Sequence, residues 1–202
     1  AAHGVPLLYV LRPDSARAGE AQFQDPPHAF HLRYRARRLK AWGRPKEALR
    51  WFEAAVALDP IDAALRVELA TLALQNGDHE TAATHLATAL ELSPSNTEAL
   101  ALRGAIHESQ GQIDAAIQLH ERALTNHPYH LLSLRSLARL YADLGRREEA
   151  AALFRRLARM QPEAAYLAYH RLGLNLREKG AYESAAWAFA QALEVDIDSP
   201  KT

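Results

Sequence analysis

Glycines recur along the chain at a constant interval. Gly43, Gly77, Gly111 and Gly145 are each 34 residues apart, and Gly180 follows after 35. Two further columns keep this interval: an alanine lies five residues after every glycine, and a proline lies seventeen residues after each of the first four (Ala48, Ala82, Ala116, Ala150, Ala185; Pro60, Pro94, Pro128, Pro162). A fixed period of about 20 to 50 residues indicates a repeat architecture, so we expect similar units stacked along one axis.

Each unit is predicted to be a pair of helices. Apolar residues follow helical spacing on both sides of Gly77, for example Leu65, Leu69 and Leu72 before it and Leu86 after it. Glycine ends the first helix, and proline follows the second, which it cannot continue. First helices are predicted near 30–42, 64–76, 98–110, 132–144 and 166–179, and second helices near 46–58, 80–92, 114–126, 148–160 and 183–195.

The period and its columns resemble the tetratricopeptide repeat. A small residue recurs in the first helix, and a large one recurs in the second (Ala36, Ala70, Gly104, Ala138, Gly173; Phe52, Leu86, Phe154, Phe189). The resemblance covers about 29–197 and implies an all-α, right-handed superhelical solenoid of about five helix-turn-helix repeats. These repeats are expected near 29–62, 63–96, 97–130, 131–165 and 166–197, between an extended N-terminal arm, 1–28, and a tail, 198–202.

The two ends of the array are candidate contact surfaces. The arm is punctuated by prolines and carries an apolar run that we expect to anchor it on the solenoid or on a partner (Val5, Leu7, Leu8, Tyr9, Leu11). No further helix is expected after the last repeat, so Tyr182 and Trp187 are expected at an end face open to a partner or a second copy. The alternative is that these aromatic side chains turn inward against repeat four.

Composition narrows the class of partner. The 24 basic and 24 acidic residues cancel, which argues against nucleic acid or an anionic membrane as partner. No apolar run is long enough to span a bilayer, and the absence of cysteine excludes disulfides and thiolate sites. The compartment stays open, although Ala1 and Ala2 would suit the residues after a signal-peptidase cut and slightly favour a bacterial, periplasmic location over the cytoplasm.

The resemblance also implies that the first helices line a concave groove for a peptide or protein. Its candidate residues are Phe30, Arg33, Tyr34, Arg37, Lys40, Val67, Glu68, Thr71, Leu102, Ala105, Arg135, Arg139, His170, Arg171, Leu174 and Arg177. Residues 29–62 hold 8 basic and 4 acidic side chains, 63–130 hold 3 and 8, and 131–165 hold 7 and 4. Both ends of the groove are therefore basic, which favours a partner with acidic segments, unless these charges only solvate the helices or pair with one another.

No pattern typical of an enzyme is present. His79 and His85 are six residues apart, whereas a zinc-protease helix needs two histidines four apart. His107 and His120 are expected to form a polar pair inside repeat three. We assign no catalytic residue, metal ligand or cofactor and expect a non-enzymatic adaptor or scaffold; the alternatives are a self-assembling structural protein and an accessory subunit with a histidine-based metal or ligand site.

Overall fold

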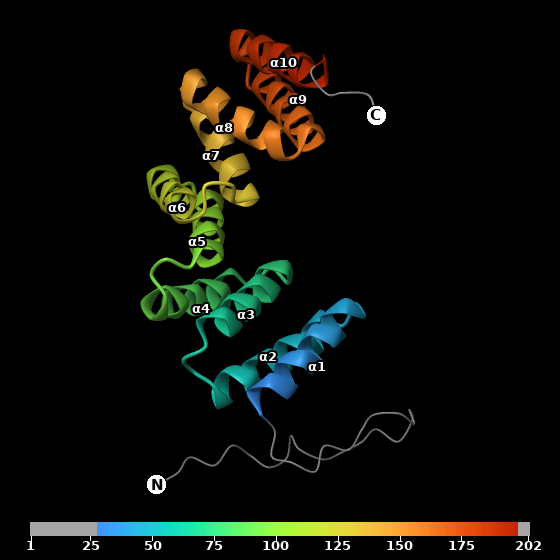
Figure 1. Ribbon diagram of the computed structural model, residues 1–202, viewed down its shortest axis with the longest axis vertical. Helices are drawn as coiled ribbons and strands as arrows, with labels where there is room; N and C mark the ends of the chain where they lie inside the picture. The colour runs from blue at the N-terminus through green and yellow to red at the C-terminus, as the bar shows by residue number, and fades with distance from the viewer. Residues whose placement is uncertain (1–27, 198–202) are drawn as a thin grey trace.

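The computed structural model describes residues 28–197, and these residues form ten α-helices arranged as five stacked pairs (Figure 1). The arm and the tail, with the arm anchor predicted at Val5 to Leu11, lie outside the described residues. The helices are α1 (Ala29–Ala41), α2 (Pro45–Leu58), α3 (Ala63–Gln75), α4 (His79–Leu92), α5 (Thr97–Ser109), α6 (Ile113–Asn126), α7 (Leu131–Asp143), α8 (Arg147–Met160), α9 (Pro162–Glu178) and α10 (Tyr182–Ile197). The expectation of an all-α helical repeat fold is confirmed.

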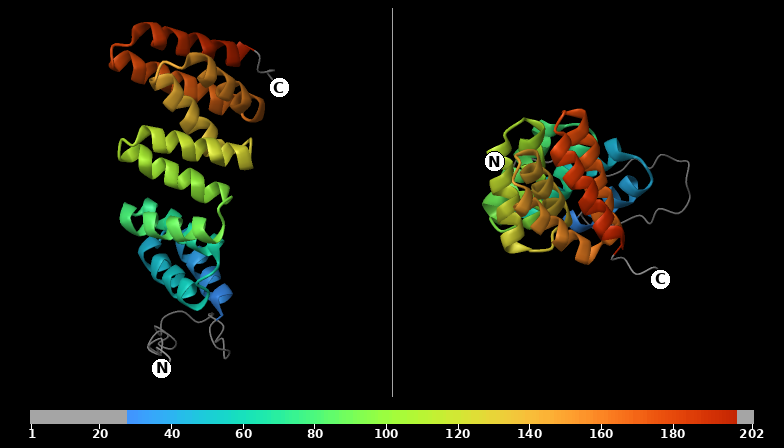
Figure 2. Two further views of the ribbon diagram at one scale, coloured as in Figure 1. Left: turned by 90° about the vertical axis from the view of Figure 1, so that its left-hand side faces the viewer. Right: turned by 90° about the horizontal axis from the view of Figure 1, so that it is seen from above.

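Each pair packs on the next one along a single axis. The second helix of each pair contacts the first helix of the following pair, and the first helices α3, α5, α7 and α9 also contact one another in succession. The side view in Figure 2 shows the pairs as layers, and the view from above shows that successive pairs point in different directions around the axis. The first helices therefore share one face of the molecule.

The recurring glycines make the turns inside the pairs. All five have positive φ, between 72° and 79°, a backbone conformation that side chains with a Cβ disfavour. At Gly77, for example, the following amide of Asp78 donates back to the carbonyl of Ala73 at 2.9 Å, which closes the end of α3. The glycine period thus has a direct backbone cause.

Side-chain caps and a proline fix several helix starts. Asp62, Asp78 and Asn96 each accept a hydrogen bond from the backbone amide three residues later, at the starts of α3, α4 and α5. Pro162 begins α9 directly after α8, because the first position of a helix does not need an N–H. For this reason α9 starts four residues earlier than its predicted start at 166.

The core consists of small and large buried residues that form several clusters along the array. The small first-helix residues Ala36, Ala70 and Ala138 are fully buried, and Phe52 and Phe154 in the second helices are 1% exposed. One cluster of buried side chains extends from Ala116 in α6 to Ala192 in α10 without a break between repeats. A stacked array of this kind buries its apolar surface repeat by repeat, which leaves the outer face of the first helices to other roles.

Candidate interaction face on the first helices

The first-helix face consists of the outward side chains of α1, α3, α5, α7 and α9. Its candidate residues fall into columns set by the distance to the glycine of their repeat. Arg33, Val67, Arg135 and His170 lie ten residues before their glycines, and Arg37, Thr71, Ala105, Arg139 and Leu174 lie six before. Because the first helices contact one another from α3 to α9, one column runs across several repeats.

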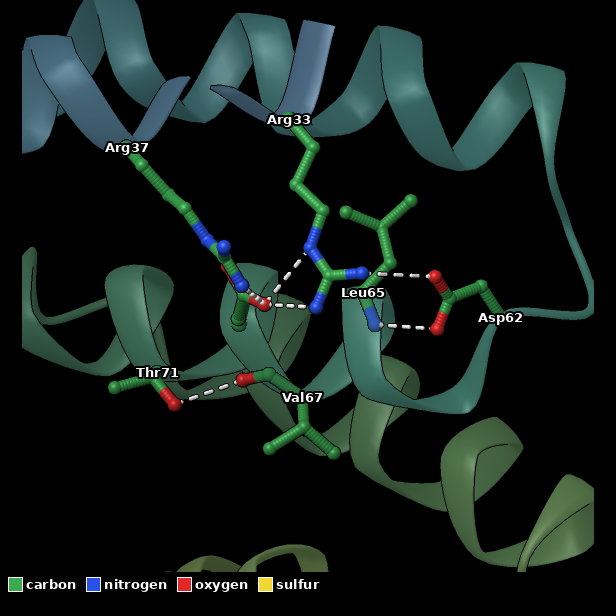
Figure 3. Close-up of polar contacts among 7 residues, drawn as sticks. Arg33, Arg37, Asp62, Leu65, Val67 and Thr71 are labelled. Carbon is green, nitrogen blue, oxygen red and sulfur yellow. Dashed lines mark hydrogen bonds and ion pairs between the residues drawn. The ribbon is translucent and has the colours of Figure 1, made fainter. Parts of the chain in front are cut away.

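Between repeats one and two, the cationic side chains are already paired (Figure 3). Arg33 donates from Nε to Glu68 at 2.9 Å and from Nη1 to Asp62 at 3.1 Å. Arg37 donates to the same Glu68 carboxylate at 2.7 and 2.6 Å. Asp62 also caps α3 by accepting from the amide of Leu65 at 2.9 Å. Two arginines and two carboxylates thus neutralise one another across the repeat junction.

The electrostatics of Glu68 reflect this pairing. Partial burial acts to raise the pKa of Glu68, but hydrogen bonds from Arg37 and Arg33 and their positive charges outweigh it, so the pKa lies below its ordinary value. The hydrogen bond to Glu68 in turn raises the pKa of Arg37. The Arg33 side chain is 23% exposed, and its charge is taken up by ion pairs within the fold. The sequence analysis had placed it in a basic end of the groove.

A second polar network joins repeats three and four. His120 is fully buried; its Nε2 lies 2.9 Å from the Glu108 carboxylate, and its Nδ1 lies 3.4 Å from the hydroxyl of Ser133. Glu108 also pairs with Arg139. Burial acts to raise the pKa of Glu108, but the hydrogen bond to His120 and the charge of Arg139 outweigh it, so this pKa is lowered.

The expected pair of His107 and His120 is not formed. His107 contacts the side chain of Gln112, its nearest polar partner past the turn glycine, whereas His120 takes the buried position of the large second-helix column. Gly104 makes room for it, since a Cβ there would lie 2.7 Å from His120 Nε2. A histidine in this column therefore depends on a glycine in the small-residue column.

Repeats four and five keep cationic side chains that form no ion pair within the described part of the chain. Arg135, Arg171 and Arg177 are exposed, and none of them forms an ion pair with a residue in 28–197. Arg139 differs, because it is held by Glu108 and by Asp143, the latter at 3.2 Å. Of the four arginines predicted for this end of the groove, three are thus available to a partner.

Apolar and aromatic groups lie beside these arginines on α9. Leu174 and His170 are half-buried; the His170 ring stacks on Tyr166 with centroids 6.0 Å apart. Leu167, which the sequence analysis did not select, is 50% exposed. It lies on the same helix face as His170 and Leu174, three and seven residues before them, so helical spacing alone contained the signal.

At the other end of the molecule, α1 carries exposed aromatic side chains. Phe30 and Tyr34 are 71% and 57% exposed, and Lys40 is exposed near the end of the helix. Arg38 lies over the ring of Trp42, 4.5 Å from its centroid, and 5.9 Å from that of Tyr34. Phe30, Tyr34 and Lys40, three of the residues predicted for the groove, are thus exposed at the surface.

Two residues predicted for the apolar part of the groove are buried. Val67 is 6% exposed and Leu102 is 9% exposed; both pack in the cluster that contains Leu86. The first helix of an inner repeat is covered by its own second helix and by helices of both neighbouring pairs, so its buried stripe extends farther round than in α1. Thr71 and Ala105 are half-buried, and the Thr71 hydroxyl donates to the Val67 carbonyl at 2.7 Å.

The end face is divided. Tyr182 is 71% exposed, as expected, but Trp187 packs edge-on against Tyr169 with centroids 6.0 Å apart. Phe189 fills the space that a Cβ at Gly173 would occupy, 2.6 Å from its ring. Trp187, predicted as an end-face contact, therefore turns inward against α9 and is partly buried.

The histidine pairs form ring contacts and capping bonds. His28 and His31 lie edge to face at 5.9 Å, and His127 and His130 at 6.4 Å. His130 also caps α7, and its hydrogen bond to Glu98 lowers the pKa of that carboxyl group, against a smaller effect of burial.

Within residues 28–197, no three His, Cys, Asp or Glu side chains are grouped so that they could hold a metal ion. Among the helices in this part of the chain, none is long and apolar enough to cross a membrane.

Comparisons with known proteins agree with this fold. A model of the tetratricopeptide repeat family matches residues 35–96 and 67–130, and a second such model matches 108–171. Tetratricopeptide repeat protein 7B of Homo sapiens is 32% identical over 112 residues, which are 55% of this chain and 13% of that protein. The chain thus spans only a small part of this curated relative.

Solved structures share the fold at low identity. MamA from Desulfovibrio magneticus RS-1, residue 41 to its end, has a TM-score of 0.67 and 21% identity over 86% of this chain and 97% of that chain. YrrB has a TM-score of 0.64 and 18% identity over 84% and 87%. Because the family models together match residues 35–171, well over half of the 202 residues, the chain belongs to the tetratricopeptide repeat family.

Proposed function

We propose that this protein is a non-enzymatic scaffold that binds a protein or peptide partner on its first-helix face. The proposal rests on one observation: this face carries exposed apolar and cationic side chains that the fold does not use. Phe30, Tyr34 and Leu167 are at least half exposed, and Arg135, Arg171 and Arg177 form no ion pair with any described residue. Large apolar groups beside cations are a composition that suits a protein partner.

The family supports the same class of function. The tetratricopeptide fold generally mediates protein–protein interaction, and YrrB is described as a TPR protein with an unusual peptide-binding site. Arginine forks pair well with carboxylates, so a partner with acidic segments fits this face best. The partner's identity is a separate question, because a repeat scaffold fixes a surface and leaves its use to what fits it.

The proposal is tested by capture from the source cells with matched surface variants. One variant combines Tyr34→Ala, Arg135→Glu and Leu167→Ala on the first-helix face. Its control combines Leu58→Ala, Arg50→Glu and Leu92→Ala, which change similarly exposed side chains on the second helices. We expect mass spectrometry to find a partner at defined stoichiometry with the wild type and the control, and much less with the first variant. Equal capture by all three would contradict the assignment of the face.

A second candidate function, self-assembly, is favoured by α10. Leu193 is 61% exposed, whereas Val56 and Leu124, at the same position in repeats one and three, are 8% and 7% exposed. Leu193 and Tyr182 thus leave exposed apolar side chains on α10, whereas repeats one and three bury the residue that corresponds to Leu193. We expect Leu193→Glu to lower the average mass measured by light scattering over a concentration series if copies associate through α10. A strict monomer at every concentration would exclude this function.

A further inference from the structure

The junctions at the two ends of the array differ in charge, although the same column supplies an arginine to both. Arg33 and Arg135 each lie ten residues before the glycine of their repeat. Arg33 faces Glu68 on α3 and Asp62 at the start of α3, and its charge is neutralised there. The columns that hold these two carboxylates can be followed to repeat five.

In repeat five, both carboxylates are replaced. Glu68 lies nine residues before Gly77, and the residue nine before Gly180 is Arg171. Asp62 lies fifteen residues before its glycine, and the residue at that distance from Gly180 is the buried Ala165. Arg171 thus takes the column position at this junction that Glu68 takes at the first one, and both Arg135 and Arg171 are exposed without an ion pair among the described residues.

We infer that the junction of α7 and α9 is the part of the first-helix face that takes an acidic peptide segment, with Arg135 and Arg171 as its carboxylate contacts. The inference rests on the proposed function and gives the partner its chemistry and its place. Leu167 and Leu174 on α9 supply apolar contact beside the cations, so the segment carries both carboxylates and apolar side chains. Arg33 and Arg37 contribute little to such binding, because Glu68 and Asp62 already occupy them.

Peptide binding by the full 202-residue chain tests the inference. The probe is a fluorescein-labelled twelve-residue peptide of glutamate, serine and two leucines, and its binding is followed by fluorescence anisotropy at two salt concentrations. We expect saturable binding that weakens with salt, and a loss of about tenfold in affinity for Arg171→Gln, as for one charge-assisted contact. Arg37→Gln is the matched control and is expected to change affinity less than about twofold.

A further variant, Arg171→Glu, puts a carboxylate in repeat five at the position that Glu68 has in repeat two. The new carboxylate is placed to pair with Arg135 as Glu68 pairs with Arg33, so peptide binding should vanish while the circular dichroism spectrum and the melting temperature are kept. Equal losses for Arg37→Gln and Arg171→Gln would overturn the inference. A single-stranded RNA probe that binds as tightly as the peptide would overturn it too, since any polyanion would then suffice.

The two proposals fail in different ways. If the acidic peptide does not bind but a partner from the source cells still depends on the first-helix face, the junction assignment is wrong and the scaffold function stands. If capture from cells does not depend on the face, the scaffold assignment itself is wrong.

Discussion

At the residue scale, the five repeats differ in the small first-helix residue and in the side chain that packs against it. The small first-helix column is alanine in three repeats and glycine in two, and the two glycines face His120 and Phe189 at distances that exclude a Cβ. His120 is held from both sides, by Glu108 and by Ser133, so its ring cannot move away. The choice of glycine at Gly104 is therefore tied to the buried histidine.

Gly104→Ala tests this dependence. The added methyl would lie 2.7 Å from His120 Nε2, so we expect a loss of about 1 to 2 kcal/mol in the free energy of unfolding, after the usual gain in helix propensity. The double variant Gly104→Ala, His120→Leu copies the Ala70 and Leu86 pair of repeat two and is expected to recover part of the loss. Urea unfolding measures both; an unchanged free energy for Gly104→Ala would contradict the close contact.

The charge of Glu68 contributes to stability in a direction fixed by its pKa. Because the folded state lowers this pKa, the contribution is present above about pH 4.5, the ordinary range of a glutamate, and is lost as the pH falls through the folded value. We expect Glu68→Gln to be less stable than the wild type by about 1 kcal/mol at pH 7 and to approach it on acidification. Urea unfolding at pH 7 and at a series of pH values below 4.5 measures this, with Glu91→Gln as control. A difference that stays constant with pH would refute the role of the charge.

At the scale of the elements, the glycine turns set the boundaries of the helices in each repeat. Each positive-φ glycine ends a first helix, and the amide after it bonds back into that helix, as Gln112 does to His107 at 2.9 Å. The helices and their order could be predicted because these signals are local in sequence. The early start of α9 was missed because Pro162 begins a helix there, whereas Pro60, Pro94 and Pro128 lie between helices.

Gly111→Ala tests the turn directly. Alanine at φ of 72° is strained, so we expect a loss of about 1 to 2 kcal/mol in the free energy of unfolding. Gln110→Ala is the matched control, since φ at Gln110 is −89° and suits alanine. Thermal unfolding followed by circular dichroism compares the two; equal melting temperatures would show that the turn tolerates a side chain.

For the whole molecule, the superhelical stacking decides which face residues are free. Arg33 and its partner Glu68 are 35 residues apart, one repeat plus one position, and Arg33 and Asp62 are 29 apart. The sequence pattern predicted which charged residues lie on the first-helix face. It did not predict which carboxylate pairs with which arginine across a repeat junction. The burial of Val67 and Leu102 was missed for the same reason, because both side chains pack in one cluster that α3, α4 and α5 form together across two repeats.

The measurement that tests the central claim most directly is photo-crosslinking in the source cells from single positions. A benzophenone side chain replaces Leu167 on the first-helix face, or Leu92 at the end of a second helix, two sites that are 50% and 42% exposed. A scaffold that holds its partner on the first helices gives one discrete crosslinked product from position 167 and none from position 92. A product from position 92 alone, or from neither position, would contradict that assignment.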